Sequence, residues 1–155
     1  MVRVLFVCLG NICRSPMAEG VFQHLVDEAG LGEEIIVDSA GTGSWHVGER
    51  AHSGTRGVLR QHGIEYQGRS RQMTRDDLAR FDYVLAMDRS NLNGIRSLAD
   101  DSTAATIRLF LDYAPQAGTR EVPDPYYSGR FDEVYNLVRQ AAAGLLTHIR
   151  EAHAL

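Results

Sequence analysis

The chain has 155 residues, which fits one domain spanning residues 1–155 with a single sizeable core. Hydrophobic residues make up 44% and charged residues 23%, an ordinary globular balance, and the net charge of −4 gives no reason to expect nucleic acid as a partner. No apolar run approaches the roughly 20 residues of a membrane span, so no membrane association is expected. The two cysteines, five residues apart, do not form a disulfide framework, and no signal-peptide pattern is present. We therefore expect a cytoplasmic protein, with a secreted protein whose signal was removed as the alternative.

The positive charges are unevenly distributed. All 16 basic residues are arginines, and six of them lie between residues 46 and 75, against two glutamates. Such a basic segment either steers an anionic substrate toward the protein or forms a solvated face. The sequence leaves both alternatives open.

Short apolar runs alternate with amphipathic stretches along the whole chain. The apolar runs predict four strands, at residues 4–7, 34–39, 83–87 and 106–111. Helices are predicted at 16–29, about 51–62, from 74, after Ser90, and at 131–152. Ser15 is suited to cap the first of these helices. Alternating strands and helices indicate an α/β fold with a parallel sheet.

The carboxyl ends of the predicted strands indicate where a site should lie, because open parallel sheets bind ligands at that edge. The segment Cys8–Arg14 follows the first strand, and Ser39–Ser44 follows the second. Asp88 follows the third strand, and the loop 112–130 follows the fourth. The first of these segments has the most unusual composition.

The stretch "CLGNICRS" at residues 8–15 predicts a phosphate-binding loop. Gly10 and Asn11 are the residue types that best tolerate left-handed backbone, so the loop can direct several amide N–H groups at one point. The helix that follows directs its N-terminus there as well. Arg14 can grip two phosphate oxygens at once. A Cys8 thiolate in this positive field is placed to attack phosphorus, and Ser15 can donate its hydroxyl to the sulfur.

Other interpretations of the cysteine loop fit less well. A lone cysteine after a strand is often a small buried hydrophobe. Zinc needs four ligands, and the sequence has no other cysteine, so no metal site is expected. The spacing is neither that of a C-x-x-C redox pair nor that of a nucleotide-binding P-loop.

The pattern C-x5-R-[ST] after the first strand is the signature of cysteine-dependent phosphatases. Together with "DPYY" at 124–127, and with "VDSAGT" and "FDYVLAMDRSNL" between them, the chain resembles the low-molecular-weight protein tyrosine phosphatases over its whole length. The resemblance implies a flavodoxin-like three-layer sandwich with a four-stranded parallel sheet. It also implies hydrolysis of phosphotyrosine in proteins, or of small phosphate monoesters, through a phosphocysteine, without a metal or other cofactor. Inorganic phosphate or another oxyanion would bind in the loop.

The resemblance assigns roles to particular residues. Cys8 would be the nucleophile, Arg14 the phosphate clamp and Asp124 the general acid and base. The phosphate-binding loop would consist of Leu9, Gly10, Asn11, Ile12, Cys13, Arg14 and Ser15. Trp45, Tyr126 and Tyr127 would form the rim that receives the substrate ring. The prolines on either side of Asp124 restrict its backbone, which helps to aim a carboxylate.

Three further residues carry two interpretations each. Asp88 and His62 match family positions that brace the site, but Asp88 could serve only as a helix cap and His62 only as a partner of the helix dipole. Cys13 could trap an oxidised Cys8 as a disulfide, or could be a passive small side chain.

One segment departs from the family pattern. The stretch 45–55, "WHVGERAHSGT", lacks the prolines often found there, so substrate preference is less well defined than chemistry. The sequence of the cysteine loop has a bacterial character.

Two other functions were considered. An arsenate reductase can use the same fold and oxyanion loop, but with only two cysteines it would need an external thiol. A phosphoprotein-binding module would need the phosphate cradle but neither a nucleophile nor an acid.

Overall fold

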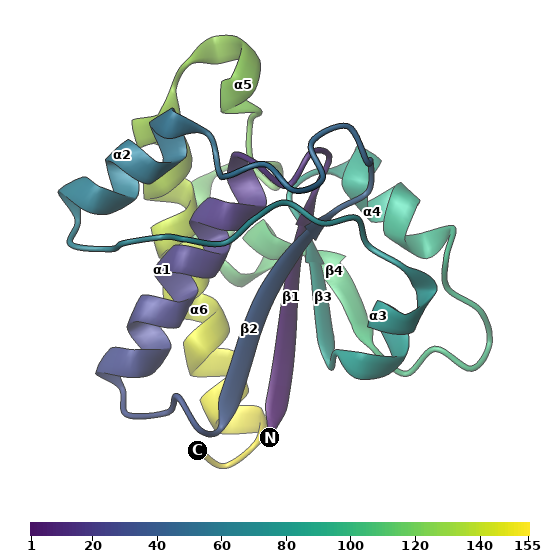
Figure 1. Ribbon diagram of the computed structural model, residues 1–155. Helices are drawn as coiled ribbons and strands as arrows, with labels where there is room; N and C mark the ends of the chain where they lie inside the picture. The colour runs from purple at the N-terminus through teal and green to yellow at the C-terminus, as the bar shows by residue number, and fades with distance from the viewer.

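In the computed structural model, which describes residues 1–155, a parallel sheet lies between two layers of helices (Figure 1). The strands are β1 (Val2–Cys8), β2 (Ile35–Gly41), β3 (Tyr83–Ala86) and β4 (Thr106–Leu109). They lie in the order β2-β1-β3-β4, the order of flavodoxin-like sheets. This confirms the predicted α/β class and the four-stranded parallel sheet.

The helices divide between the two faces of the sheet. One face is covered by α1 (Arg14–Glu28) and α6 (Phe131–Ala152), with α2 (Ser53–Gln61) packed against both. The other face carries α3 (Arg75–Arg80) and α4 (Arg89–Arg96). The short helix α5 (Pro125–Ser128) lies in the loop between β4 and α6, at the carboxyl edge of the sheet (Figure 1). The segment between β4 and α5 also contains two 3₁₀ turns, Phe110–Tyr113 and Pro115–Ala117.

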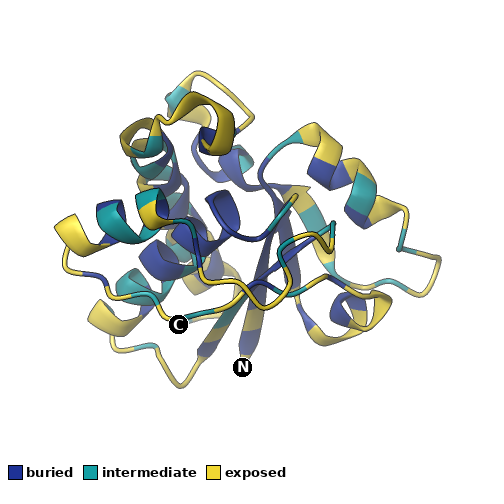
Figure 2. Cartoon of the chain, turned by 45° about the horizontal axis from the view of Figure 1, so that its top comes forward, coloured by how far each residue is buried: buried dark blue, intermediate teal, exposed yellow.

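The central strand β1 is buried on both sides, as is usual for parallel sheets. Val4 and Phe6 pack toward α1 and α6, while Leu5 and Val7 pack toward α3 and α4. Figure 2 shows the middle of the sheet mainly in dark blue, with exposed residues on the outer surfaces of the helices and on the loops. No helix combines the length and the apolarity that crossing a bilayer requires. Because β1 is held from both sides, its last residue, Cys8, has a well-defined position opposite Gly41 of β2.

Local signals located several elements correctly. Thr74 begins α3 through a capping box with Asp77, as the sequence pattern predicts. Helix α6 has the predicted bounds, and its periodic apolar side chains are fully buried. Those side chains are Val134, Val138, Ala141, Leu145 and Ile149.

Several predicted boundaries differ from the observed ones by one to three residues, and two of these differences have a clear physical reason. The apolar run 106–111 is a strand only as far as Leu109, because Phe110 and Leu111 enter the core from a 3₁₀ turn rather than from the sheet. Helix α1 begins at Arg14 with Cys13 at the N-cap, so Ser15 is not the cap. The Ser15 hydroxyl lies instead against Cys8 and Asn11.

Candidate active site

The cysteine loop turns sharply between β1 and α1, and one residue makes the turn possible. Asn11 adopts φ 56°, in the left-handed region that Asn tolerates better than most residues. Gly10 has a different reason to be glycine: a Cβ there would lie 2.9 Å from Cδ2 of His46. The loop therefore fits closely under the segment that carries Trp45 and His46.

The Cys8 sulfur lies at the base of this loop, and the residue Cys8 is 3% exposed. The backbone N–H of Asn11 is directed at the sulfur over 3.3 Å, and the Ser15 hydroxyl lies 3.0 Å from it. Both groups favour a sulfur that carries negative charge, because hydrogen bonds to an anion are the strongest kind.

The side chain of Asn11 determines how the neighbouring hydroxyls point. Its Oδ1 accepts the backbone N–H of Arg71, so its Nδ2 donates to Ser15 and Ser39 at 2.8 and 2.9 Å. Each serine oxygen accepts one of these hydrogens, which leaves its own hydrogen free. Ser39 donates its hydrogen to Glu19 at 2.6 Å, whereas the hydrogen of Ser15 can be donated to the Cys8 sulfur at 3.0 Å or to the more distant Ala40 carbonyl at 3.5 Å.

Glu19 terminates this hydrogen-bond chain beneath the loop. Its Oε1 accepts hydrogen bonds from Ser39 and from the Tyr66 hydroxyl, at 2.6 and 2.7 Å. Burial raises the pKa of the Glu19 carboxyl, and the two hydrogen bonds act against that shift. Sequence analysis missed Glu19 and Ser39, although Glu19 lies one helical turn after Ser15 and so on the same side of α1.

Arg14 is held from one side by the protein. Its Nη1 donates to Asp88 Oδ2 at 2.6 Å and to the Val122 carbonyl at 3.0 Å, and its Nη2 lies 3.6 Å from Asp124 Oδ2. Burial lowers the pKa of Arg14, but the Cys8 sulfur and Asp88 outweigh it, so the guanidinium stays charged. Asp88 both caps α4, through Asn91, and contacts Arg14, so its two expected roles coexist.

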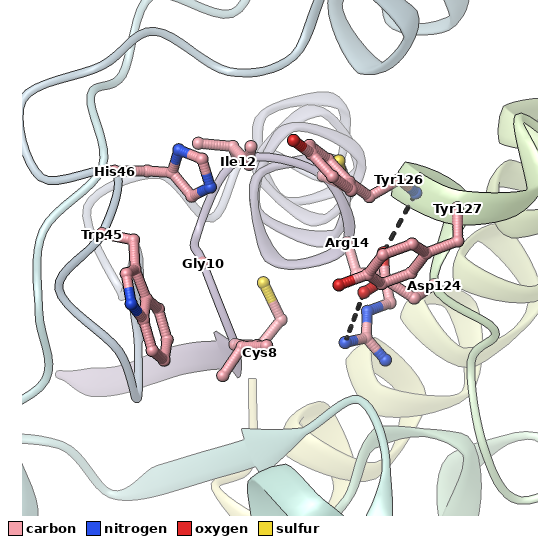
Figure 3. Close-up of a pocket in the computed structure, with 11 residues that line it drawn as sticks. Cys8, Gly10, Ile12, Arg14, Trp45, His46, Asp124, Tyr126 and Tyr127 are labelled. Carbon is pink, nitrogen blue, oxygen red and sulfur yellow. Dashed lines mark hydrogen bonds and ion pairs between the residues drawn. The ribbon is translucent and has the colours of Figure 1, made fainter.

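Asp124 begins α5 and faces Arg14. Its Oδ1 accepts the backbone N–H of Tyr126 at 3.0 Å, and its side chain is 28% exposed. Figure 3 shows Asp124 and Arg14 together on one side of the cavity and Trp45 and His46 on the opposite side, with Cys8 between them. The Asp124 carboxyl thus lines the cavity and is partly exposed to solvent.

A cavity of about 380 Å³ gathers most of the expected site residues (Figure 3). It is lined by Cys8, Leu9, Gly10, Ile12, Cys13, Arg14, Trp45, His46, Asp124, Tyr126 and Tyr127. The rim is open, since Trp45 is 72%, Tyr126 52% and Tyr127 82% exposed. Flat exposed rings above a buried nucleophile suit an aryl group whose phosphate reaches the loop.

The structure bears on two alternatives that the sequence left open. His62 is exposed at the end of α2, where its ring stacks on Tyr135 at 3.8 Å between centroids, and its side chain makes no hydrogen bond to the site. It does not brace the loop. Of the six arginines in the basic segment, none lines the cavity, and Arg71 pairs with Asp38 and Asp77. His46 lines the cavity and was missed, because nothing in its local sequence marks it.

Comparison with known proteins decides the identity. The sequence profile described as "Low molecular weight phosphotyrosine protein phosphatase" matches residues 3–155. The chain belongs to this family. This phosphatase is similar to the low molecular weight protein-tyrosine-phosphatase YfkJ of Bacillus subtilis, with 46% identity over all of both chains. It is 47% identical to the corresponding Streptomyces coelicolor enzyme, covering 96% of this chain and 94% of the relative.

Solved structures agree with this assignment. The crystal structure of YfkJ superposes with a TM-score of 0.94, covering 98% of this phosphatase and 96% of YfkJ. A Drosophila arginine phosphatase superposes with a TM-score of 0.90 at 35% identity, covering 95% and 97% of the two chains. The expected family, fold and activity are therefore confirmed: this phosphatase is a low molecular weight protein-tyrosine-phosphatase.

Proposed function

We propose that Cys8, Arg14 and Asp124 carry the chemistry of phosphotyrosine hydrolysis in this phosphatase. One observation supports this most directly: the Cys8 sulfur receives an amide N–H and a hydroxyl at the base of a cavity whose wall holds Arg14 and Asp124. One substrate bound in this cavity can therefore contact the nucleophile, the phosphate clamp and the acid at the same time.

In the first step, the Cys8 thiolate attacks phosphorus in line with the ester oxygen. The S–P bond forms as the P–O bond to tyrosine breaks, and Asp124 gives its proton to the departing phenolate. The loop 9–15 binds the phosphoryl oxygens through its amides, and Arg14 offers them its Nη2 edge, since Nη1 is engaged by Asp88.

In the second step, water hydrolyses the phosphocysteine. Asp124, now ionised, takes a proton from the attacking water, the S–P bond breaks, and inorganic phosphate leaves. The hydrogen of Ser15 stabilises the returning thiolate, because Asn11 holds the serine oxygen in the orientation that leaves this hydrogen free.

Phosphotyrosine in cytoplasmic proteins is the substrate we propose, with the open aromatic rim accommodating the side chain of a folded or unfolded protein. The Drosophila relative is an arginine phosphatase, so phosphoarginine belongs in the same assay. We expect kcat/KM for a phosphotyrosine peptide to exceed that for a phosphoarginine peptide. A preference for phosphoarginine would reassign the substrate and leave the cysteine chemistry intact.

Replacing Asp124 with asparagine tests the acid. We expect kcat/KM to fall by about 10²- to 10³-fold for phosphotyrosine, whose leaving group has a pKa of about 10, because that phenolate needs a proton. The loss should shrink steadily as the leaving group becomes more acidic, in a series of substituted phenyl phosphates. An equal loss across the series would exclude Asp124 as the acid.

We also propose that Cys13 protects Cys8 from irreversible oxidation. Burial raises the pKa of the Cys13 thiol to about 12, with the charges of Cys8 and Asp124 adding to the shift, so Cys13 stays protonated at neutral pH. Peroxide oxidises the Cys8 thiolate to a sulfenic acid, and the second oxygen of the peroxide leaves as hydroxide. The Cys13 sulfur then attacks the Cys8 sulfur while the Cys13 thiol proton passes to the sulfenic-acid oxygen, so a disulfide forms and that oxygen leaves as water.

Replacing Cys13 with serine separates protection from catalysis. We expect turnover within about twofold of the wild type, because Cys13 takes no part in the proposed steps. After peroxide and then dithiothreitol, the wild type should regain its activity and the variant should not. Full recovery of the variant, or no intramolecular disulfide in the mass of the oxidised wild type, would contradict the proposal.

A further inference from the structure

The last part of the segment that departs from the family pattern, "AHSGT" at 51–55, forms an unusual junction beside the acid loop. His52 is the N-cap of α2, and its Nδ1 accepts the backbone N–H of Gly54 at 2.9 Å. A capping acceptor is normally Ser, Thr, Asp or Asn, any of which would fill this role with a smaller side chain. The imidazole is therefore larger than the capping role requires.

The ring of His52 lies between two aromatic side chains from other parts of the chain. It stacks on Phe131, the first residue of α6, with 4.9 Å between centroids and 26° between planes. Its other contact is an edge-to-face approach to Tyr126 of α5, at 6.1 Å and 79°. Both distances fall in the range of favourable aromatic pairs. Figure 1 shows the start of α2 next to the start of α6, under the turn that carries α5.

Gly54 makes this arrangement possible. A Cβ on Gly54 would lie 2.4 Å from Cε2 of Phe131, so only glycine allows the Phe131 ring to come this close to α2. His52 and Gly54 thus act as a pair: the histidine supplies a flat ring, and the glycine leaves room for the ring on which it stacks.

The contact continues from Tyr126 to Asp124. The backbone N–H of Tyr126 donates to Asp124 Oδ1 at 3.0 Å, so the position of Tyr126 determines where that carboxylate points. Tyr126 is 52% exposed, and its ring neighbours are His52, His46 and Tyr127. Tyr127 belongs to the same short helix and moves with it. On the α2 side, Tyr126 joins α5 to the body of the protein through its contact with His52.

We infer that His52 is a positioning residue for the general acid: it holds Tyr126, and through Tyr126 it aims Asp124 at the leaving group. This inference rests on the role of Asp124 proposed above. It explains why a histidine occupies a helix cap that smaller residues would fill. It also gives the atypical segment 51–55 a function in catalysis rather than in substrate choice.

Three substitutions separate the ring from the cap. His52→Phe keeps a flat ring but loses the Nδ1 acceptor, whereas His52→Asn keeps an acceptor but loses the ring. His52→Ala loses both. We expect Ala and Asn to lower kcat/KM for phosphotyrosine about tenfold, because a carboxyl misplaced by less than an ångström transfers its proton less well. With phenyl phosphates that have acidic leaving groups, the loss should be less than about twofold.

The Phe variant should retain the wild-type dependence on the leaving group, although losing the cap lowers its Tm. The Asn variant should keep the wild-type Tm but show a steeper dependence of kcat/KM on the leaving group. If activity instead follows Tm across the three variants, His52 is only a helix cap and the inference fails. His62→Ala is the matched control, because His62 stacks on α6 at the far end of α2, away from the acid loop. It should leave the leaving-group dependence unchanged.

A double-mutant cycle with Asp124→Asn completes the test. In the Asp124→Asn background, His52→Ala should cost less than about twofold with phosphotyrosine, because no acid remains to be aimed. A full tenfold loss in that background would show that His52 acts by another route. If Asp124→Asn itself leaves the leaving-group dependence unchanged, Asp124 is not the acid. This result comes from the single variant and is therefore distinguishable from any result with His52.

Discussion

Replacing Cys8 with serine is expected to abolish turnover and to leave phosphate binding intact. A serine hydroxyl at this position is a poor nucleophile, since the loop stabilises a sulfur anion and supplies no base to ionise an alcohol. We expect kcat to fall on the order of 10⁴-fold or more, as when other enzymes lose their nucleophile. The Arg14 guanidinium, which we propose grips phosphate, is held by Asp88 and the Val122 carbonyl rather than by the sulfur.

Phosphate binding by the Cys8→Ser variant distinguishes lost chemistry from lost structure. Removing a negative sulfur from beneath a dianion removes a repulsion, so inorganic phosphate should bind at least as tightly as to the wild type. Isothermal titration calorimetry measures this directly. Cys13→Ser is the matched control, because it removes the other thiol from the same loop and should turn over normally. Residual Cys8→Ser activity within tenfold of the wild type would mean that another group attacks phosphorus.

The sequence predicted the loop well because its chemistry is local. Cys8, the turn through Asn11, and Arg14 lie within one short segment, and a strand before it and a helix after it leave few ways to arrange them. The cap of α3 and the buried face of α6 were predicted for the same reason, since each depends on spacing within a single element.

The supporting residues were harder to predict because they meet only in the folded chain. One hydrogen-bond network joins Glu19 of α1, Ser39 of β2 and Tyr66 of a loop, and no local sequence pattern predicts it. The two histidines at the ends of α2 illustrate the same difficulty. Resemblance favoured His62, which stacks on Tyr135 away from the site, whereas His52 contacts the acid loop. The orientation of α2 against α6 determines which of the two histidines contacts the acid loop.

The contacts of Arg14 indicate why this position should hold a guanidinium rather than another positively charged group. Its Nη1 is already committed to Asp88 and to the Val122 carbonyl, and the side chain is 4% exposed. The protein thereby orients one edge of the planar group toward Asp88 and leaves the other toward Asp124 and the cavity. A planar fork can satisfy both sides at once, with little conformational entropy left to lose when phosphate binds.

Replacing Arg14 with lysine should therefore be severe although the charge is kept. One ammonium cannot reach Asp88, the Val122 carbonyl and two phosphoryl oxygens together, so we expect kcat/KM to fall about 10²- to 10³-fold. The thermal stabilisation by inorganic phosphate should also be largely lost. Arg71→Lys is the matched control, because Arg71 bridges Asp38 and Asp77 outside the cavity, and its activity should change by less than about threefold. If Arg14→Lys retains both activity and phosphate protection, point charge suffices, and the two-sided grip assigned to Arg14 is wrong.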